Sequence, residues 1–201
     1  MSRGAGRSRA GPRWRKGWLG GARRVASPNF NVRPAGTEIT LALIHSISLP
    51  PGVYGGDAIE RLFTNRLDWR AHPYFATIEG LEVSAHFLIR RDGELLQFVS
   101  CDDRAWHAGA SSWRGRPDCN DYSVGIELEG LEGEPFEPVQ YDVLSALLRS
   151  LARRYPIEAI AGHEHVAPGR KADPGAGFDW VALERSLGWP ASALPTPARD
   201  V

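Results

Sequence analysis

The stretch Tyr122-Ser-Val-Gly-Ile-Glu-Leu-Glu129 decides which kind of fold this chain can form. Val, Ile and Leu alternate with Ser and two glutamates, which is the two-residue period of a β-strand with one apolar face. Taken by itself, the pattern places Glu127 on the polar face, as a solvated surface carboxylate beside Glu129.

A second strand is predicted by the branched apolar run Ile39-Thr-Leu-Ala-Leu-Ile44. A continuous run of this type suits a strand that is buried on both faces, and this one ends at His45. Residues 50–56 are rich in Pro and Gly and predict a surface loop. A short helix is expected over Asp57 to Asn65, with Asp57 as its cap.

The remaining periodicities add a hairpin and helices. Residues 83–90 and 95–99 flank Asp92-Gly93, a typical hairpin turn. Apolar residues at helical spacing between Pro138 and Pro156 predict one long amphipathic helix, and residues 178–187 predict a weaker one. Strands interleaved with helices indicate an α/β fold, a single domain with a central mixed β-sheet flanked by helices.

Charge and composition divide the 201 residues into three parts. Residues 1–16 carry six basic residues and no acidic one, whereas residues 17–201 carry 18 basic and 24 acidic residues. Such an arm could contact nucleic acid, but its low apolar content favours a disordered leader that the domain does not need. We therefore expect a folded domain over 17–189 and a loose tail over 190–201.

No apolar run approaches the ~20 residues of a membrane span, and none behaves like a signal peptide. These features predict a cytoplasmic protein with no membrane or nucleic-acid partner, and we expect a monomer. Cys101 and Cys119 are expected to be free thiols, because a domain of this size folds without disulfides.

Polar residues that could bind a metal follow the predicted strands. His45 ends one strand, His163 follows the apolar segment 157–161, and Asp173 lies in a loop broken by Pro and Gly. Two imidazoles and a carboxylate with one open position form a usual catalytic zinc site. The spacing also leaves open a chelating pair of His163 and His165. Lys171 is one of only two lysines in a chain with 22 arginines, which suggests that its compact charge is required.

Six ordered segments resemble one known family. They are Gly17-Trp-Leu-Gly-Gly-Ala-Arg-Arg24, His45-Ser-Ile-Ser-Leu-Pro-Pro-Gly52, Val83-Ser-Ala-His-Phe-Leu-Ile-Arg-Arg-Asp-Gly93, Arg104-Ala-Trp-His-Ala-Gly109, Cys119-Asn-Asp-Tyr-Ser-Val-Gly-Ile-Glu-Leu-Glu-Gly130 and the segment from Gly162-His163 through Arg170-Lys-Ala-Asp-Pro-Gly175. Together they resemble the cytoplasmic anhydro-N-acetylmuramyl-L-alanine amidases of the AmpD type, within the zinc amidase and peptidoglycan-recognition superfamily.

The resemblance implies the activity and the role of each site residue. It implies hydrolysis of the amide between (anhydro-)N-acetylmuramic acid and L-alanine in muropeptides during peptidoglycan recycling. One zinc ion (Zn²⁺) per chain would bind His45, His163 and Asp173, which favours His163 over His165. Glu127 and Lys171 would be catalytic. Trp106 and His107 would line the site and contact the muropeptide.

Two positions depart from the pattern of these relatives, and one rival function remains. Ser46 stands where relatives have Asn, and Asp118 stands where they have Arg, so Arg116 is the candidate to supply the lost charge to substrate. The rival is a non-catalytic protein that binds peptidoglycan fragments. Such superfamily members lose a metal ligand, whereas all three are present here. A closed structural zinc site would need a fourth ligand, and neither cysteine lies beside the three in sequence.

Overall fold

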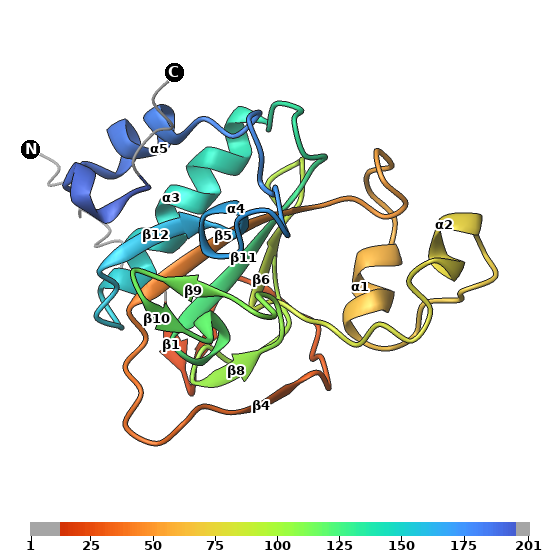
Figure 1. Cartoon of the computed structure of the whole chain (residues 1–201), viewed down its shortest axis with the longest axis horizontal. Coiled ribbons are helices and arrows are strands. Elements are labelled where there is room, and N and C mark those ends of the chain that lie inside the picture. Colours follow the sequence, from red (N-terminus) through yellow and green to blue (C-terminus); the bar gives the residue numbers. More distant parts are fainter. Residues whose placement is uncertain (1–12, 196–201) are drawn as a thin grey trace, which may run out of the picture.

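The predicted strand at 122–129 forms as β11 (Ser123–Glu129). It lies inside a six-stranded mixed sheet whose strand order is β12 (Ala159–Gly162), β5 (Leu41–Ile47), β11, β6 (Phe87–Ile89), β7 (Leu95–Gln97) and β3 (Arg23–Arg24) (Figure 1). The computed structural model describes residues 13–195. Strand β11 pairs in parallel with β5 and β6, and β5 pairs in parallel with β12. The short strands outside this sheet are β1 (Trp14–Arg15), β2 (Trp18–Leu19), β4 (Phe30–Val32), β8 (Asp103–Ala105), β9 (Ser112–Trp113) and β10 (Arg116–Pro117).

The helices are α1 (Ala58–Phe63), α2 (Pro73–Ala76), α3 (Pro138–Ala152), α4 (His163–Val166) and α5 (Trp180–Leu187). Two 3-10 turns, η1 (Cys119–Asp121) and η2 (Ala191–Ala193), complete the described elements.

Both faces of the sheet are covered, which corrects the interpretation of Glu127 as a surface carboxylate. The apolar side chains of β11 pack against leucines of α3 and α5. The opposite face, which carries Glu127, lies under loops and under the segment that holds α1 and α2. Glu127 is only 8% exposed and Glu129 only 2%. The alternation of apolar and polar residues predicted the strand correctly, but a two-residue period does not show what covers the polar face.

The predicted hairpin and the long helix are confirmed. Strands β6 and β7 pair antiparallel, and α3 buries a stripe of four leucines against the sheet, each worth roughly 1.5–3 kcal/mol of transfer free energy. Helix α1 also forms, with Asp57 at its N-cap position, but the Asp57 side chain makes no capping hydrogen bond. It pairs instead with Arg61, one turn later.

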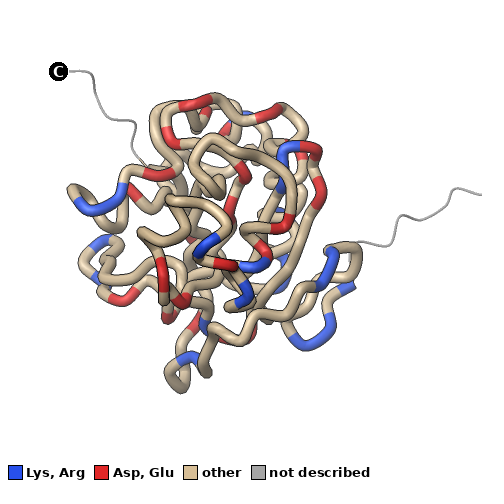
Figure 2. Tube along the Cα trace, turned by 90° about the vertical axis from the view of Figure 1, so that its right-hand side faces the viewer, with Lys and Arg blue, Asp and Glu red and all other residues tan. Residues whose placement is uncertain are grey.

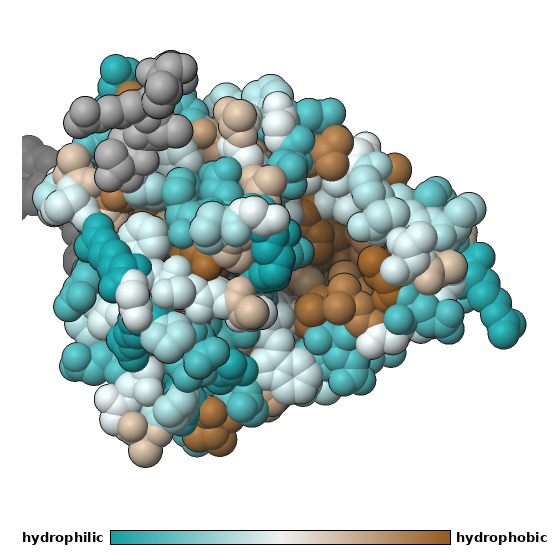
Figure 3. Space-filling model, in the orientation of Figure 1, coloured by the Kyte–Doolittle hydropathy of each residue, from teal (hydrophilic) through white to brown (hydrophobic). Residues whose placement is uncertain are grey.

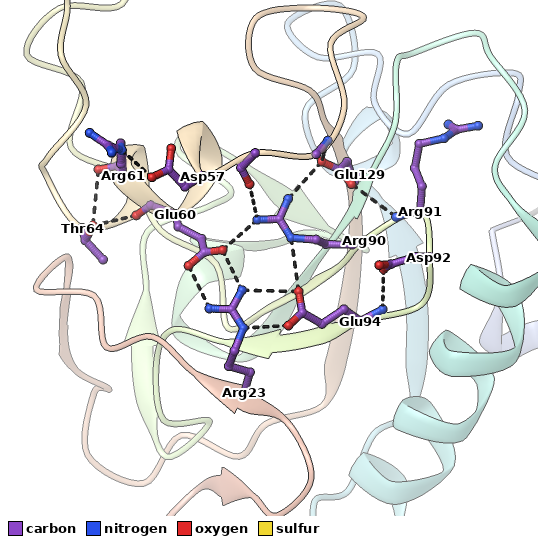
Figure 4. Close-up of polar contacts among 12 residues, drawn as sticks. Arg23, Asp57, Glu60, Arg61, Thr64, Arg90, Arg91, Asp92, Glu94 and Glu129 are labelled. Carbon is purple, nitrogen blue, oxygen red and sulfur yellow. Dashed lines mark hydrogen bonds and ion pairs between the residues drawn. The ribbon is translucent and has the colours of Figure 1, made fainter.

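A network of charged side chains holds α1 against the sheet (Figure 4). The Arg23 guanidinium pairs with Glu60 of α1 and with Glu94 of the hairpin. Arg90, which is 9% exposed at its side chain, pairs with the same two glutamates and with Glu129 at the end of β11. The network therefore ties the segment that carries α1 to the strand that carries Glu127.

The two chain ends differ from the predicted boundaries. Trp14 belongs to the predicted leader, yet its indole packs edge-on against Phe87 and Tyr155 and donates a hydrogen bond to Ser150 Oγ at 2.9 Å. In the predicted tail, Leu194 is buried. The folded domain therefore extends beyond 17–189 at both ends. The rest of the predicted leader, 1–12, and of the tail, 196–201, lies outside the described residues.

Over residues 13–195, basic and acidic residues are interspersed along the trace (Figure 2). No helix in this range is long and apolar enough to cross a membrane. Cys101 and Cys119 are buried free thiols, as predicted.

Candidate active site

The candidate site lies at the carboxyl ends of three neighbouring parallel strands. His45 is the fifth residue of β5, Glu127 lies opposite it on β11, and His163 directly follows β12. Ligands collect at this edge of an open sheet, because the strands end there and loops begin. Strand β5 continues to Ile47, so His45 lies within the strand. The sequence had instead predicted that the strand ends at His45.

Three candidate metal ligands converge at this edge. His45 Nδ1 lies 3.0 Å from His163 Nδ1, and Asp173 Oδ2 lies 3.1 Å from the first and 3.2 Å from the second. Zinc bonds of 2.0–2.2 Å at tetrahedral angles place ligand atoms roughly 3.3–3.5 Å apart. The three atoms therefore form a nearly equilateral triangle whose sides are slightly shorter than this spacing, so a small outward movement of the side chains would accommodate a zinc ion.

The proton positions agree with a metal site. His163 Nε2 lies 3.0 Å from the carbonyl oxygen of Ala108, which can only accept, so Nε2 carries the proton and Nδ1 presents a lone pair. Burial lowers the pKa of His45 to about 4, which keeps that imidazole neutral. Burial opposes ionisation of Asp173, but its contacts with His163 and His45 outweigh burial and hold its pKa below the usual range. Two lone pairs and a carboxylate in contact call for a shared cation.

Glu127 has the properties of a general base. Burial, with a smaller contribution from the charge of Asp173, raises its pKa well above the usual value, and the charge of Lys171 opposes this shift. Its Oε2 atom is buried and has no hydrogen-bond partner among the described residues. An unpaired carboxylate oxygen in a cleft is available to a water molecule or a substrate.

These residues line one wall of a cleft of about 780 Å³. The opposite wall is apolar and comes from the segment that contains α1 and α2. The space-filling view shows this hollow with apolar side chains inside it (Figure 3). The residues of that wall include Leu49, Leu62, Phe63, Tyr74, Ile78 and Leu81. The cleft therefore pairs a polar catalytic wall with an apolar one, which suits a mixed sugar and peptide ligand.

Comparison with known proteins identifies the family. Residues 35–176 match the family model of N-acetylmuramoyl-L-alanine amidase. The chain belongs to this amidase family.

Individual relatives of the amidase family match nearly the whole chain. The 1,6-anhydro-N-acetylmuramyl-L-alanine amidase AmpD of Citrobacter freundii is 52% identical over 179 residues, which cover 88% of this chain and 95% of that protein. A crystal structure of a selenomethionine derivative of AmpD superposes with a TM-score of 0.83 at 50% identity, covering 86% of this chain and 98% of that one. The amidase AmiD of Escherichia coli, in complex with anhydro-N-acetylmuramic acid-L-Ala-D-γ-Glu-L-Lys, superposes at 0.55 with 29% identity, covering 77% and 60%.

Within this amidase fold, most of the predicted site residues come together. Lys171, Ser46 and Trp106 line the cleft beside the triad. His107 also lines the cleft, but both of its ring nitrogens have protein partners, His45 and Ser123.

Two other candidates, one histidine and one arginine, lie outside the group of proposed site residues. His165 takes no part in the triad, because its Nδ1 accepts the backbone N–H of Gly162. Arg116 is exposed and does not line the cleft. Its guanidinium stacks 3.8 Å from the ring centroid of Tyr122, so the structure does not bring Arg116 to the site.

Two features of the site were not predicted from the sequence. The apolar wall comes from a segment whose sequence reads only as loop and short helix. Arg170 was also missed, although it adjoins Lys171; it donates at 2.6 Å to the carbonyl of Ala108, the same oxygen that orients His163. The one signal in the sequence for this contact is that Arg170 directly precedes Lys171, a candidate site residue.

Proposed function

We propose that this protein hydrolyses the amide bond between 1,6-anhydro-N-acetylmuramic acid and L-alanine, with one zinc ion held by His45, His163 and Asp173. The observation that carries the proposal is the triangle of three ligand atoms, 3.0–3.2 Å apart, beside the buried Glu127. The AmpD relatives, at about half identity over most of the chain, support the same reaction.

The residues fit zinc in number and in kind. Three protein ligands leave one position for water or substrate, as in catalytic rather than structural zinc sites. When bound, zinc supplies Lewis-acid polarisation of a carbonyl and lowers the pKa of water towards neutrality. The three ligand side chains would hold the ion, and the neutral imidazole of His45 leaves its lone pair free for it.

Glu127 would move the proton. As water attacks the lactyl carbonyl carbon, the Glu127 carboxylate accepts a proton from that water. When the C–N bond breaks, the same proton passes to the departing amine of L-alanine. Burial raises the pKa of this carboxyl group, which makes it a stronger proton acceptor than a solvated glutamate.

Lys171 would stabilise the negative charge that develops on the carbonyl oxygen. It lines the cleft beside Asp173, and its charge acts on both Glu127 and His45. Removing one donor to an oxyanion typically costs about 10²–10³ in rate.

The proposed substrate is a small anhydro-muropeptide. The AmpD relatives are 1,6-anhydro-N-acetylmuramyl-L-alanine amidases, and AmiD was solved with an anhydro-muramyl peptide. The resemblance to recycling amidases also leads us to propose a cytoplasmic monomer. Fractionation of cells and light scattering of the purified protein test location and oligomeric state.

The proposal is tested by metal content and activity together. The purified protein should bind about one zinc per chain, and a chelator should abolish release of the peptide from anhydro-muropeptide until zinc is restored. Asp173→Ala should lose most of the metal and the activity. Glu158→Ala, which removes an exposed carboxylate before β12, is the matched control and should keep both. Full activity of Asp173→Ala in chelator would refute the proposed centre.

A further inference from the structure

His107 lies directly behind one of the proposed ligands. The inner nitrogen of His45, Nδ1, faces His163 and Asp173, while its outer nitrogen, Nε2, lies 3.0 Å from His107 Nδ1. His107 Nε2 in turn lies 3.3 Å from Ser123 Oγ. The two rings meet edge to face, at 86°.

The proton assignment follows from this chain of contacts. If His45 Nδ1 offers its lone pair to a metal, its proton lies on Nε2 and is donated to His107 Nδ1. His107 must then carry its own proton on Nε2, where Ser123 Oγ accepts it.

Gly125 provides the seat for the His107 ring. A Cβ atom at this position would lie 2.5 Å from Cγ and 2.6 Å from Nδ1 of His107, well inside van der Waals contact. Gly125 is on the same face of β11 as Ser123 and Glu127. A glycine inside a buried strand weakens it, and close approach by another group explains its presence here.

The backbone that carries His107 is also fixed. The side-chain oxygen of Asn120, a buried residue, accepts the backbone N–H groups of both His107 and Ala108. The Ala108 carbonyl then accepts from His163 Nε2 at 3.0 Å. One short segment thus holds the outer nitrogens of both proposed histidine ligands.

We propose that His107, seated on Gly125, is a positioning residue that fixes the tautomer and the ring orientation of His45 and so sets the zinc affinity of the site. The inference rests on the proposed zinc centre. It assigns to His107 a role behind the metal rather than a contact with substrate. Outer hydrogen-bond partners of metal-binding histidines typically change metal affinity by about 10–100-fold.

Two substitutions at the same position separate the hydrogen bond from packing. His107→Phe keeps the ring volume but removes the acceptor, and the zinc dissociation constant should rise by about 10-fold or more. In His107→Asn the side-chain oxygen can take the place of Nδ1, so the dissociation constant should stay within about threefold of the wild type. His72→Phe, a change at an exposed histidine far from the triad in sequence, is the control and should leave the affinity unchanged.

A third variant tests the seat. Gly125→Ala should also weaken zinc binding, because the new methyl group displaces the His107 ring. In a His107→Ala background that ring is gone, and Gly125→Ala should then have little further effect on zinc affinity. Such non-additivity identifies the ring as the route by which position 125 acts.

The measurement is competition with a chromogenic chelator, without substrate, on proteins whose melting temperatures are recorded without metal. Cobalt-substituted protein adds a spectroscopic readout, since a rotated His45 changes the visible absorption of the ion. Wild-type affinity in His107→Phe, or equal loss in His107→Phe and His107→Asn, would overturn the inference while leaving the zinc centre intact. A wild-type protein that binds no zinc would instead refute the proposed function, and the inference with it.

Discussion

Glu127 on β11 lies directly opposite His45 on β5 in the parallel pairing of the two strands. Paired residues of neighbouring strands point to the same face of a sheet, so the proposed base and a proposed metal ligand share one wall of the cleft. Two residues 82 positions apart in sequence are thus held side by side by the longest strand pairing of the sheet.

The pairing predicts different consequences for the two glutamates of β11. Glu127→Gln keeps the shape of the side chain and removes the proton acceptor, so turnover should fall by about 10²-fold or more while zinc content is retained. Glu129 pairs with Arg90 and accepts the backbone N–H of Gly55. These contacts give Glu129 a structural role in the cleft wall, away from the reacting atoms. Glu129→Gln should lower the melting temperature and leave turnover per folded molecule nearly unchanged. The assignment of the base is wrong if Glu129→Gln is the variant that loses turnover.

The proposed anhydro-muropeptide substrate predicts a preference for the anhydro sugar. A site built around one ring form penalises a ligand that brings an additional hydroxyl group with no partner. We expect kcat/KM for an anhydro-muropeptide to exceed that for the matched hydrated fragment by about 10-fold or more. The two substrates are compared side by side on one enzyme preparation. Equal kcat/KM values would show that the enzyme does not distinguish the two forms of the sugar ring.

The contacts of Trp14 predict that this residue stabilises the domain, contrary to the expectation from sequence that 1–16 is dispensable. Trp14→Ala removes a half-buried indole and its hydrogen bond to Ser150, which should cost roughly 2 kcal/mol. For a domain of this size the melting temperature should fall by about 4–8 °C. Arg15→Ala, at an exposed neighbour, is the control. An unchanged melting temperature in Trp14→Ala would show that the indole contributes nothing to stability.

His86 predicts a loss of stability in acid. Burial, reinforced by the charge of Arg33, lowers its pKa to about 3, whereas an unfolded histidine has a pKa near ~6.5. Between these values the unfolded chain binds one more proton than the folded chain, so stability falls as pH falls through this window. Its Nδ1 accepts the N–H of Gly125, and the side-chain oxygen of an asparagine can do the same.

The test compares wild type with His86→Asn, both without metal, by urea unfolding at about pH 7 and about pH 5. Wild type should lose about 2 kcal/mol more between these values than the variant. Parallel losses would mean that His86 titrates normally in the folded protein.

Local patterns in the sequence predicted β5, β11, the hairpin of β6 and β7, and α3, because periodicity and turn residues act within a few positions. They failed where distant segments decide the environment. Glu127 reads as a surface residue because the loops that bury it come from elsewhere in the chain. Trp14 follows a run of basic residues, and nothing nearby reveals that it packs against Phe87.

The site itself was predicted in part. The segments around His45, His163 and Asp173 were recognisable, and the structure brings these three side chains together. The place of His107 could not be predicted, because it depends on the strand register that puts Gly125 beneath its ring. Arg116 was predicted to supply the positive charge that relatives have at the position of Asp118. Its stacking on Tyr122 is a tertiary contact, which the charge pattern of the sequence cannot predict.

The most direct test of the proposed reaction is mass spectrometry of the products formed from anhydro-muropeptide in water enriched in heavy oxygen. Hydrolysis at the lactyl carbonyl places the heavy isotope in the new carboxylate of the anhydro-muramic acid product and none in the released peptide. We predict this labelling for the zinc-loaded enzyme and no cleavage in the presence of chelator. Release of peptide without label in the sugar acid, or cleavage at any other bond, would contradict the account.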